Sequence, residues 1–74
     1  MILLGKTITV EASSQPSFTG LAGEVVEDTR ETLAVRTPDG VIRTLVKHTI
    51  TVRADDRILG PDALRGTHAA RLRR

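Results

Sequence analysis

The chain of 74 residues has no cysteine, tryptophan or tyrosine, and Phe18 is its only aromatic residue. Without thiols it forms neither disulfides nor thiolate metal sites, and its two histidines, His48 and His68, lie too far apart in sequence for a zinc-ligand pattern. The lack of aromatic rings argues against recognition of single-stranded bases by stacking. We therefore expect no metal or other cofactor to be bound by this chain.

Long apolar runs are also missing. The opening residues 1–5, MILLG, are too short for the apolar core of a signal peptide or for a membrane span, and no positive leader precedes them, so we expect a cytoplasmic protein with no membrane partner. A chain this short buries only about 60% of its unfolded surface, which predicts one domain with a thin core and no large enclosed active site. Hydrophobic residues make up 39% and charged residues 27%, as in soluble globular domains.

The net charge of +2 is unevenly distributed. Residues 1–54 carry six basic and six acidic groups, whereas residues 55–74 carry five arginines and three aspartates. The last arginines, Arg65, Arg71, Arg73 and Arg74, have no acid among them. An arginine fork holds a phosphate through two hydrogen bonds, so this cluster suits an RNA backbone. A solvated basic end that aids solubility is an equally good interpretation of composition alone.

Alternation of apolar and polar residues predicts strands. In residues 6–12, Ile8, Val10 and Ala12 share one face and polar residues the other. The predicted strands are residues 6–12, 21–28, 32–37, 41–47 and 49–53, joined by a loop at 13–20, turns at 29–31 and 38–40, and a corner at 47–48. Short strands without a helical period indicate an all-β fold, a small antiparallel barrel of five to six strands.

Within this barrel we expect Gly23 to mark a sharp bend and Phe18 to cap one end of the core. The core candidates are Val25, Val26, Leu33, Val35, Ile50 and Val52. After the fifth strand we predict a turn at 55–57, an apolar contact at 58–59, a break or helix start at 60–62, and a marginal short helix or frayed tail within 67–74. The single domain would comprise a barrel over about 4–60 and a basic C-terminal segment over about 61–74.

Candidate catalytic groups have simpler structural explanations. Asp55 and Asp56 are adjacent, so their side chains point apart, and a turn explains them better than a metal site. His48 fits a surface corner between strands. The serines at 13, 14 and 17 lack the Gly-x-Ser-x-Gly context of a hydrolase, and no glycine-rich phosphate loop is present. We expect no autonomous active site.

Several motifs carry a family resemblance. They are Leu3 to Gly5 before the first strand, the loop residues 16–20, the stretch from Gly23 to Leu33 with its Asp-Thr-x-x-Thr-Leu pattern, and the basic strand from Arg43 to Lys47. Together, residues 3–47 resemble the archaeal ribonuclease P protein component 1, the small barrel subunit that archaeal and eukaryotic ribonuclease P share.

The resemblance implies an Sm-like barrel that stabilises a catalytic RNA. In that particle the RNA subunit cleaves the 5′ leader from precursor tRNA with magnesium ions, and the barrel pairs with a zinc-ribbon protein subunit. The candidate RNA contacts in this chain are Lys6, Arg30, Arg36, Arg43, Lys47, Arg65, Arg71, Arg73 and Arg74. The alternative function is an Sm-like or SH3-like barrel that acts as a general RNA-binding module or binds proteins through an exposed strand edge.

Overall fold

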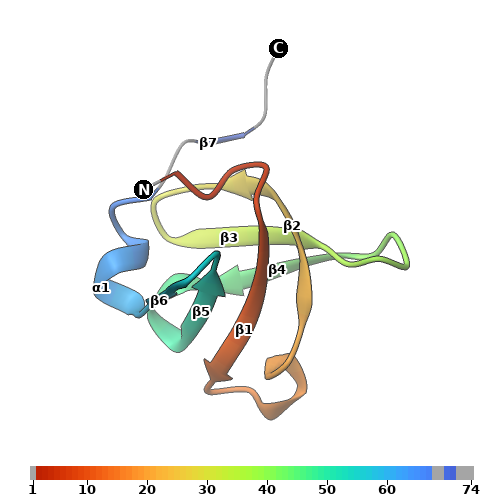
Figure 1. Cartoon of the computed structure of the whole chain (residues 1–74), viewed down its shortest axis with the longest axis horizontal. Coiled ribbons are helices and arrows are strands. Elements are labelled where there is room, and N and C mark those ends of the chain that lie inside the picture. Colours follow the sequence, from red (N-terminus) through yellow and green to blue (C-terminus); the bar gives the residue numbers. More distant parts are fainter. Residues whose placement is uncertain (1, 68–69, 72–74) are drawn as a thin grey trace.

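The computed structural model describes residues 2–67 and the backbone of residues 70–71. This part of the chain forms seven strands, one α-helix and two 3-10 turns (Figure 1). In chain order they are β1 (Thr7–Ser13), η1 (Pro16–Phe18), β2 (Ala22–Asp28), β3 (Thr32–Arg36), β4 (Ile42–Val46), η2 (Lys47–Thr49), β5 (Ile50–Ala54), β6 (Arg57–Leu59), α1 (Pro61–Leu64) and β7 (Ala70–Arg71).

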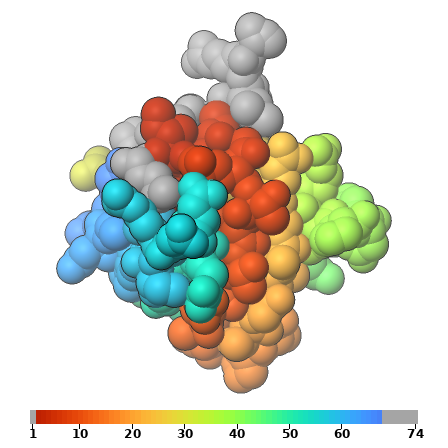
Figure 2. Space-filling view, viewed as in Figure 1, coloured from red at the N-terminus to blue at the C-terminus, as the bar shows by residue number. Residues whose placement is uncertain are grey.

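The strands form one curled antiparallel sheet. Its order is β4-β3-β2-β1-β5-β6, and β7 pairs with β2 beside this path. The 38–40 turn forms as predicted: Gly40 has a φ of 90°, and its N–H donates to the Thr37 carbonyl at 2.9 Å. The turn joins β3 to β4 and projects from the barrel (Figures 1 and 2). The small antiparallel all-β barrel predicted from the sequence is thus confirmed.

A β-bulge changes which residues of β1 face the core. The register of β1 against β5 shifts between Val10 and Ala12. Ile8 and Val10 are buried before the bulge, whereas Ala12 is exposed and Ser13 is half-buried after it. The prediction that Ala12 shares the inner face is therefore wrong, because one extra residue in a strand reverses the alternation beyond it.

A second bulge has the same effect in β2. The register of β2 against β3 shifts between Val25 and Glu27. Val25 is fully buried, but Val26 is only half-buried and Asp28 faces the interior. Val26 follows buried Val25 and so faces away from the core, as alternation requires; its prediction as a core residue is wrong, and the other five core candidates are confirmed as buried. The bulge thus brings an acid, Asp28, into the barrel.

The core contains residues from the segments before β1 and after β5 as well as from the inner faces of the strands. Leu3 from the N-terminal segment, Leu59 from β6 and Leu64 from α1 are buried in the same cluster as the strand residues. Phe18 packs against this cluster, as predicted. Helix α1 begins with Pro61 in its first turn, where the missing N–H costs nothing, and contacts η2 and β6.

The C-terminal segment is extended at two residues where we predicted a marginal short helix or a frayed tail. Ala70 and Arg71 form β7, which pairs with Asp28 and Glu27 of β2, so the helix prediction is wrong at these two residues. The Val25 N–H donates to the Lys6 carbonyl and the Gly5 N–H donates to the Val25 carbonyl, so β7 joins β2 only beyond this point. The remaining residues of the predicted helix, 68–69 and 72–74, lie outside the described part of the chain. Asp55 and Asp56 form the predicted turn, but Arg57 already belongs to β6.

Gly23 lies where the backbones of β2 and β3 come closest. A Cβ at this position would be 2.3 Å from the carbonyl oxygen of Arg36 and 2.8 Å from Cγ1 of Val35. We expect Gly23→Ala to lower the free energy of unfolding by about 1–3 kcal/mol, measured by urea denaturation, because backbone must move to make room.

The matched control is Gly66→Ala. The nearest atom to a Cβ there is the Ala63 carbonyl oxygen at 3.7 Å, so we expect a change within about 0.5 kcal/mol. Equal effects of the two substitutions would contradict the close approach of β2 and β3.

Candidate nucleic-acid interface

Three surface cations are held by carboxylates from neighbouring strands or turns. Their pairs are Lys6 Nζ with Asp55 Oδ2 at 3.1 Å, Arg36 Nη2 with Glu24 Oε1 at 2.8 Å, and Arg53 Nε with Glu11 Oε2 at 2.7 Å. The hydrogen bond from Arg53 to Glu11 raises the pKa of the arginine above its usual value. Such exposed pairs contribute about 0–1 kcal/mol to stability, but a phosphate must compete with the carboxylate for each of these cations.

Lys47 lies inside the barrel. Its side chain is 2% exposed, and its Nζ is 2.5 Å from Oδ1 of Asp28, whose side chain is 0% exposed. The prediction of Lys47 as a surface contact for RNA is corrected accordingly. The distance defines an ion pair, although its angles fall outside hydrogen-bond geometry, and neither Asp28 oxygen accepts a hydrogen bond from the described residues. The two side chains still attract each other, because the Coulomb attraction between two buried charges does not require hydrogen-bond alignment.

The buried pair connects three separate segments. The Lys47 Nζ also donates to Oγ1 of Thr67 at 3.4 Å, and this hydroxyl donates to the Leu64 carbonyl at 2.9 Å. The Lys47 N–H donates to the Glu31 carbonyl at 2.9 Å. The end of β2, the 3-10 turn η2 and the segment after α1 are thereby held together around one ammonium group.

Four arginines remain exposed and have no carboxylate within ion-pair distance among the described residues. They are Arg30 in the β2–β3 turn, Arg43 in β4, Arg57 in β6 and Arg65 after α1. The nearest acid to Arg43 in the chain is Asp39, whose pKa is lowered mainly by a hydrogen bond from the Thr37 hydroxyl and less by the charge of Arg43. A phosphate can bind such a free guanidinium group without first displacing a carboxylate.

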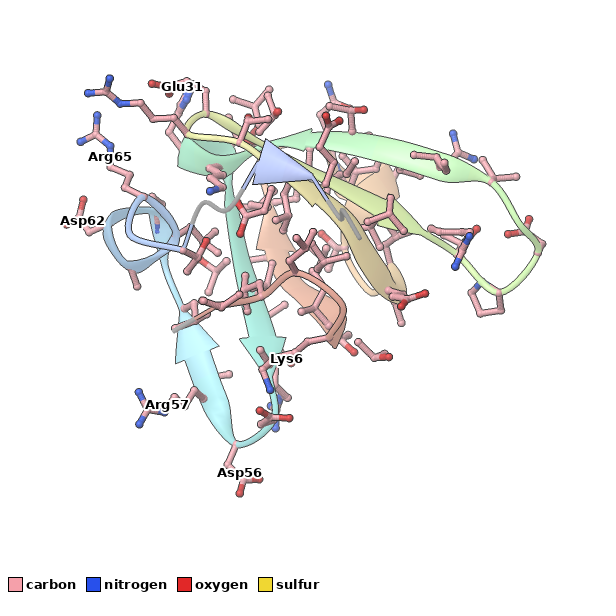
Figure 3. The ribbon with its side chains drawn as sticks, turned by 90° about the horizontal axis from the view of Figure 1, so that it is seen from above. Lys6, Glu31, Asp56, Arg57, Asp62 and Arg65 are labelled. Carbon is pink, nitrogen blue, oxygen red and sulfur yellow. The ribbon has the colours of Figure 1, made fainter. Side chains whose placement is uncertain are left out.

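Arg30 and Arg65 lie on the same side of the barrel. Arg65 lies beside Asp62 and near Glu31, which follows Arg30 in the β2–β3 turn, whereas Lys6, Asp56 and Arg57 surround the β5–β6 turn on another side (Figure 3). Because η2 contacts α1 and bonds to Glu31, the β2–β3 turn and α1 are neighbours. We call this region, residues 29–31 and 61–67, the α1 side.

The predicted tail arginines follow the α1 side in the chain. The backbone of Arg71 pairs with Glu27, at the end of β2 that leads into the β2–β3 turn. The side chain of Arg71 and residues Arg73 and Arg74 lie outside the described part. The structure thus groups Arg30, Arg65 and the backbone of β7, and it separates them from Lys6, Arg36 and Arg43 on other strands.

The described surface offers only shallow hollows. One concavity of about 350 Å³ is lined by Thr7, Gly23, Glu24, Arg36, Thr37, Pro38 and Gly40, and the face seen in Figure 2 has no deep cleft. Within residues 2–67, no group of three acidic, histidine or cysteine side chains could hold a metal ion. None of the described helices is long and apolar enough to cross a membrane. Cations on such an open surface are suited to contacts with phosphates.

The architecture defines a small antiparallel all-β barrel, in which a 3-10 turn leads into the fifth strand. A model of the family "Ribonuclease P/MRP, subunit p29" matches residues 2–66, and the chain belongs to this family of ribonuclease P protein subunits. No curated protein sequence gives a significant match. The family resemblance is therefore confirmed at the level of a ribonuclease P/MRP subunit.

Removal of one partner of the buried pair leaves the other charge without compensation. We expect Lys47→Met to lower the free energy of unfolding by about 3–5 kcal/mol, measured by chemical denaturation. The double variant Lys47→Met with Asp28→Leu replaces both charges by apolar groups and should recover most of this loss.

The exposed Arg43→Met serves as the control, with an expected change within about 0.5 kcal/mol. If the double variant is no more stable than Lys47→Met alone, the two charges are not coupled.

Proposed function

We propose that this chain is the barrel subunit of ribonuclease P that binds and stabilises the catalytic RNA during removal of the 5′ leader from precursor tRNA. The observation that carries the proposal is the family match over residues 2–66. In this role the protein supplies no catalytic group. The RNA subunit performs the cleavage with magnesium ions, and precursor tRNA meets the protein only indirectly.

The free cations of the α1 side support RNA binding there. Arg30 and Arg65 are exposed and without a carboxylate partner among the described residues, and the arginines at 71, 73 and 74 follow in the sequence. Contacts to phosphates position a protein on folded RNA without reading its bases, which agrees with the single aromatic residue of the chain. Lys6 and Arg36 are weaker candidates because carboxylates already hold them.

The finer assignment follows the resemblance of residues 3–47. It identifies the chain as the archaeal protein component 1, working in the cytoplasm as a heterodimer with the zinc-ribbon subunit of the same particle. The ribonuclease P RNA would be the principal partner of this heterodimer.

The salt dependence of RNA affinity distinguishes free from paired cations. We expect the double variant Arg30→Ala/Arg65→Ala to bind a ribonuclease P RNA transcript more weakly. The slope of log affinity against log salt concentration should become smaller in magnitude by about 0.7–0.9 for each phosphate that the protein no longer neutralises. A fluorescence titration over a salt series measures both quantities.

The matched control is Lys6→Ala/Arg36→Ala, which removes the same formal charge from cations that are already paired and should change the slope less. The triple variant Arg71→Ala/Arg73→Ala/Arg74→Ala should flatten the slope while leaving the melting temperature nearly unchanged. Equal slopes for the two double variants would reject the α1 side as the surface that binds RNA.

Activity in a reconstituted particle tests the function itself. We expect addition of this chain to increase the rate of precursor tRNA cleavage when magnesium is limiting, because a protein that stabilises the RNA fold replaces part of the magnesium requirement. The same particle without the chain is the reference. An unchanged rate at limiting magnesium would reject the proposal.

A further inference from the structure

Exposed apolar side chains gather at one edge of the sheet. Five large hydrophobic residues are exposed in the described part of the chain, and three of them, Val41, Ile42 and Val46, belong to β4 or directly precede it. Ile42 is 57% and Val46 is 41% exposed. Strand β4 is also the end of the sheet path, so one side of its backbone has no strand partner among the described residues. Natural edge strands usually carry charges or bulges that prevent pairing, and this strand has a regular register over its whole length.

A hollow of about 320 Å³ lies beside this strand. Thr44 and Val46 form one wall from β4, Phe18 contributes its half-buried ring from η1, and His48 and Thr49 close it from η2. Ile42, Thr44 and Val46 alternate along β4 and therefore share one face, while Leu45 points into the core. An unpaired edge, an apolar face and a hollow with an aromatic wall thus adjoin one another.

The charged side chains of β4 and η2 themselves are all basic. Residues 42–49 contain Arg43, Lys47 and His48 and no acid. Lys47 is compensated inside by Asp28, so exposed Arg43 carries the charge of this strand. A second copy of this chain would bring like charges together there. The phosphate and sugar surface of a folded RNA offers few apolar groups to Ile42 and Val46, so a protein with acidic residues fits this edge best.

We propose that the free edge of β4 is a docking site for an extended acidic segment of a partner protein. The segment pairs with β4 as an additional strand and places one apolar side chain in the hollow beside Phe18. Main-chain hydrogen bonds along the edge then supply affinity, and the hollow selects the side chain. Acidic residues flanking the segment lie against Arg43 and His48. The proposal does not depend on RNA binding by this chain.

Two synthetic peptides test the docking site on the full-length chain. Both contain the same alternating valine and threonine core with one central leucine; one is flanked by glutamates and the other by lysines. We expect the glutamate peptide to slow amide hydrogen exchange in residues 42–46, and the lysine peptide to bind at least about tenfold more weakly.

Ile42→Asp should weaken the glutamate peptide at least about tenfold, because it places a carboxylate on the docking face. The control is Ile58→Asp on β6, the other end of the sheet path, where the isoleucine is 54% exposed; this variant should bind the peptide as the unaltered chain does. Both substitutions are at exposed positions, and the melting temperature verifies that each variant is folded.

Three results would overturn the proposal. The first is no protection of β4 amides at about 1 mM peptide, or equal binding of the two peptides. The second is protection of β4 that grows with protein concentration alone, which would make a second copy the occupant. The third is displacement of the peptide by a ribonuclease P RNA transcript together with loss of RNA binding in Ile42→Asp, which would assign the edge to RNA.

Discussion

The buried ion pair between Lys47 and Asp28 is the interaction on which the rest of this small barrel depends. Enclosing two charges in a thin core costs several kcal/mol per ion unless each compensates the other. The pair therefore requires that β2, η2 and the segment around Thr67 remain in place together. Purely apolar contacts would tolerate small displacements of these segments, whereas a charge left unpaired in the interior would not. The position of α1 beside the β2–β3 turn, and so the arrangement of Arg30 and Arg65, follows from this requirement.

Much of the fold could be predicted because most strands alternate regularly. Leu33, Val35, Ile50 and Val52 lie inside as their period indicates, and Asp39-Gly40 marks a true turn. The error at Ala12 comes from a bulge, which depends on how two distant strands align and leaves no local signal, whereas Val26 faces outward simply because it follows Val25. Strand β7 was missed because its two residues gain their conformation by pairing with the backbone of β2, against their helical propensity.

The candidate site was less predictable than the fold because pairing of charges is a tertiary property. Lys6 and Asp55 are 49 residues apart in the chain, and Arg53 and Glu11 are 42 apart, so composition does not tell which cations are free. The burial of Lys47 did leave a signal: it shares the inward phase of β4 with Leu45 two residues earlier. No acid could be named from the sequence as the buried partner of Lys47, because Asp28 turns inward only through the bulge in β2.

The β2 bulge also makes the register of that strand as restrictive as its composition. If the bulge straightened with no residue removed, regular alternation would turn the Asp28 carboxylate to solvent and leave the Lys47 ammonium isolated inside. Over evolutionary time, gaps and insertions in this chain should therefore accumulate in the 13–20 loop and the 38–40 turn. The β2–β3 hairpin from Gly23 to Leu33 should keep its strand alignment even where side chains drift, so that pairing there is inherited more faithfully than identity.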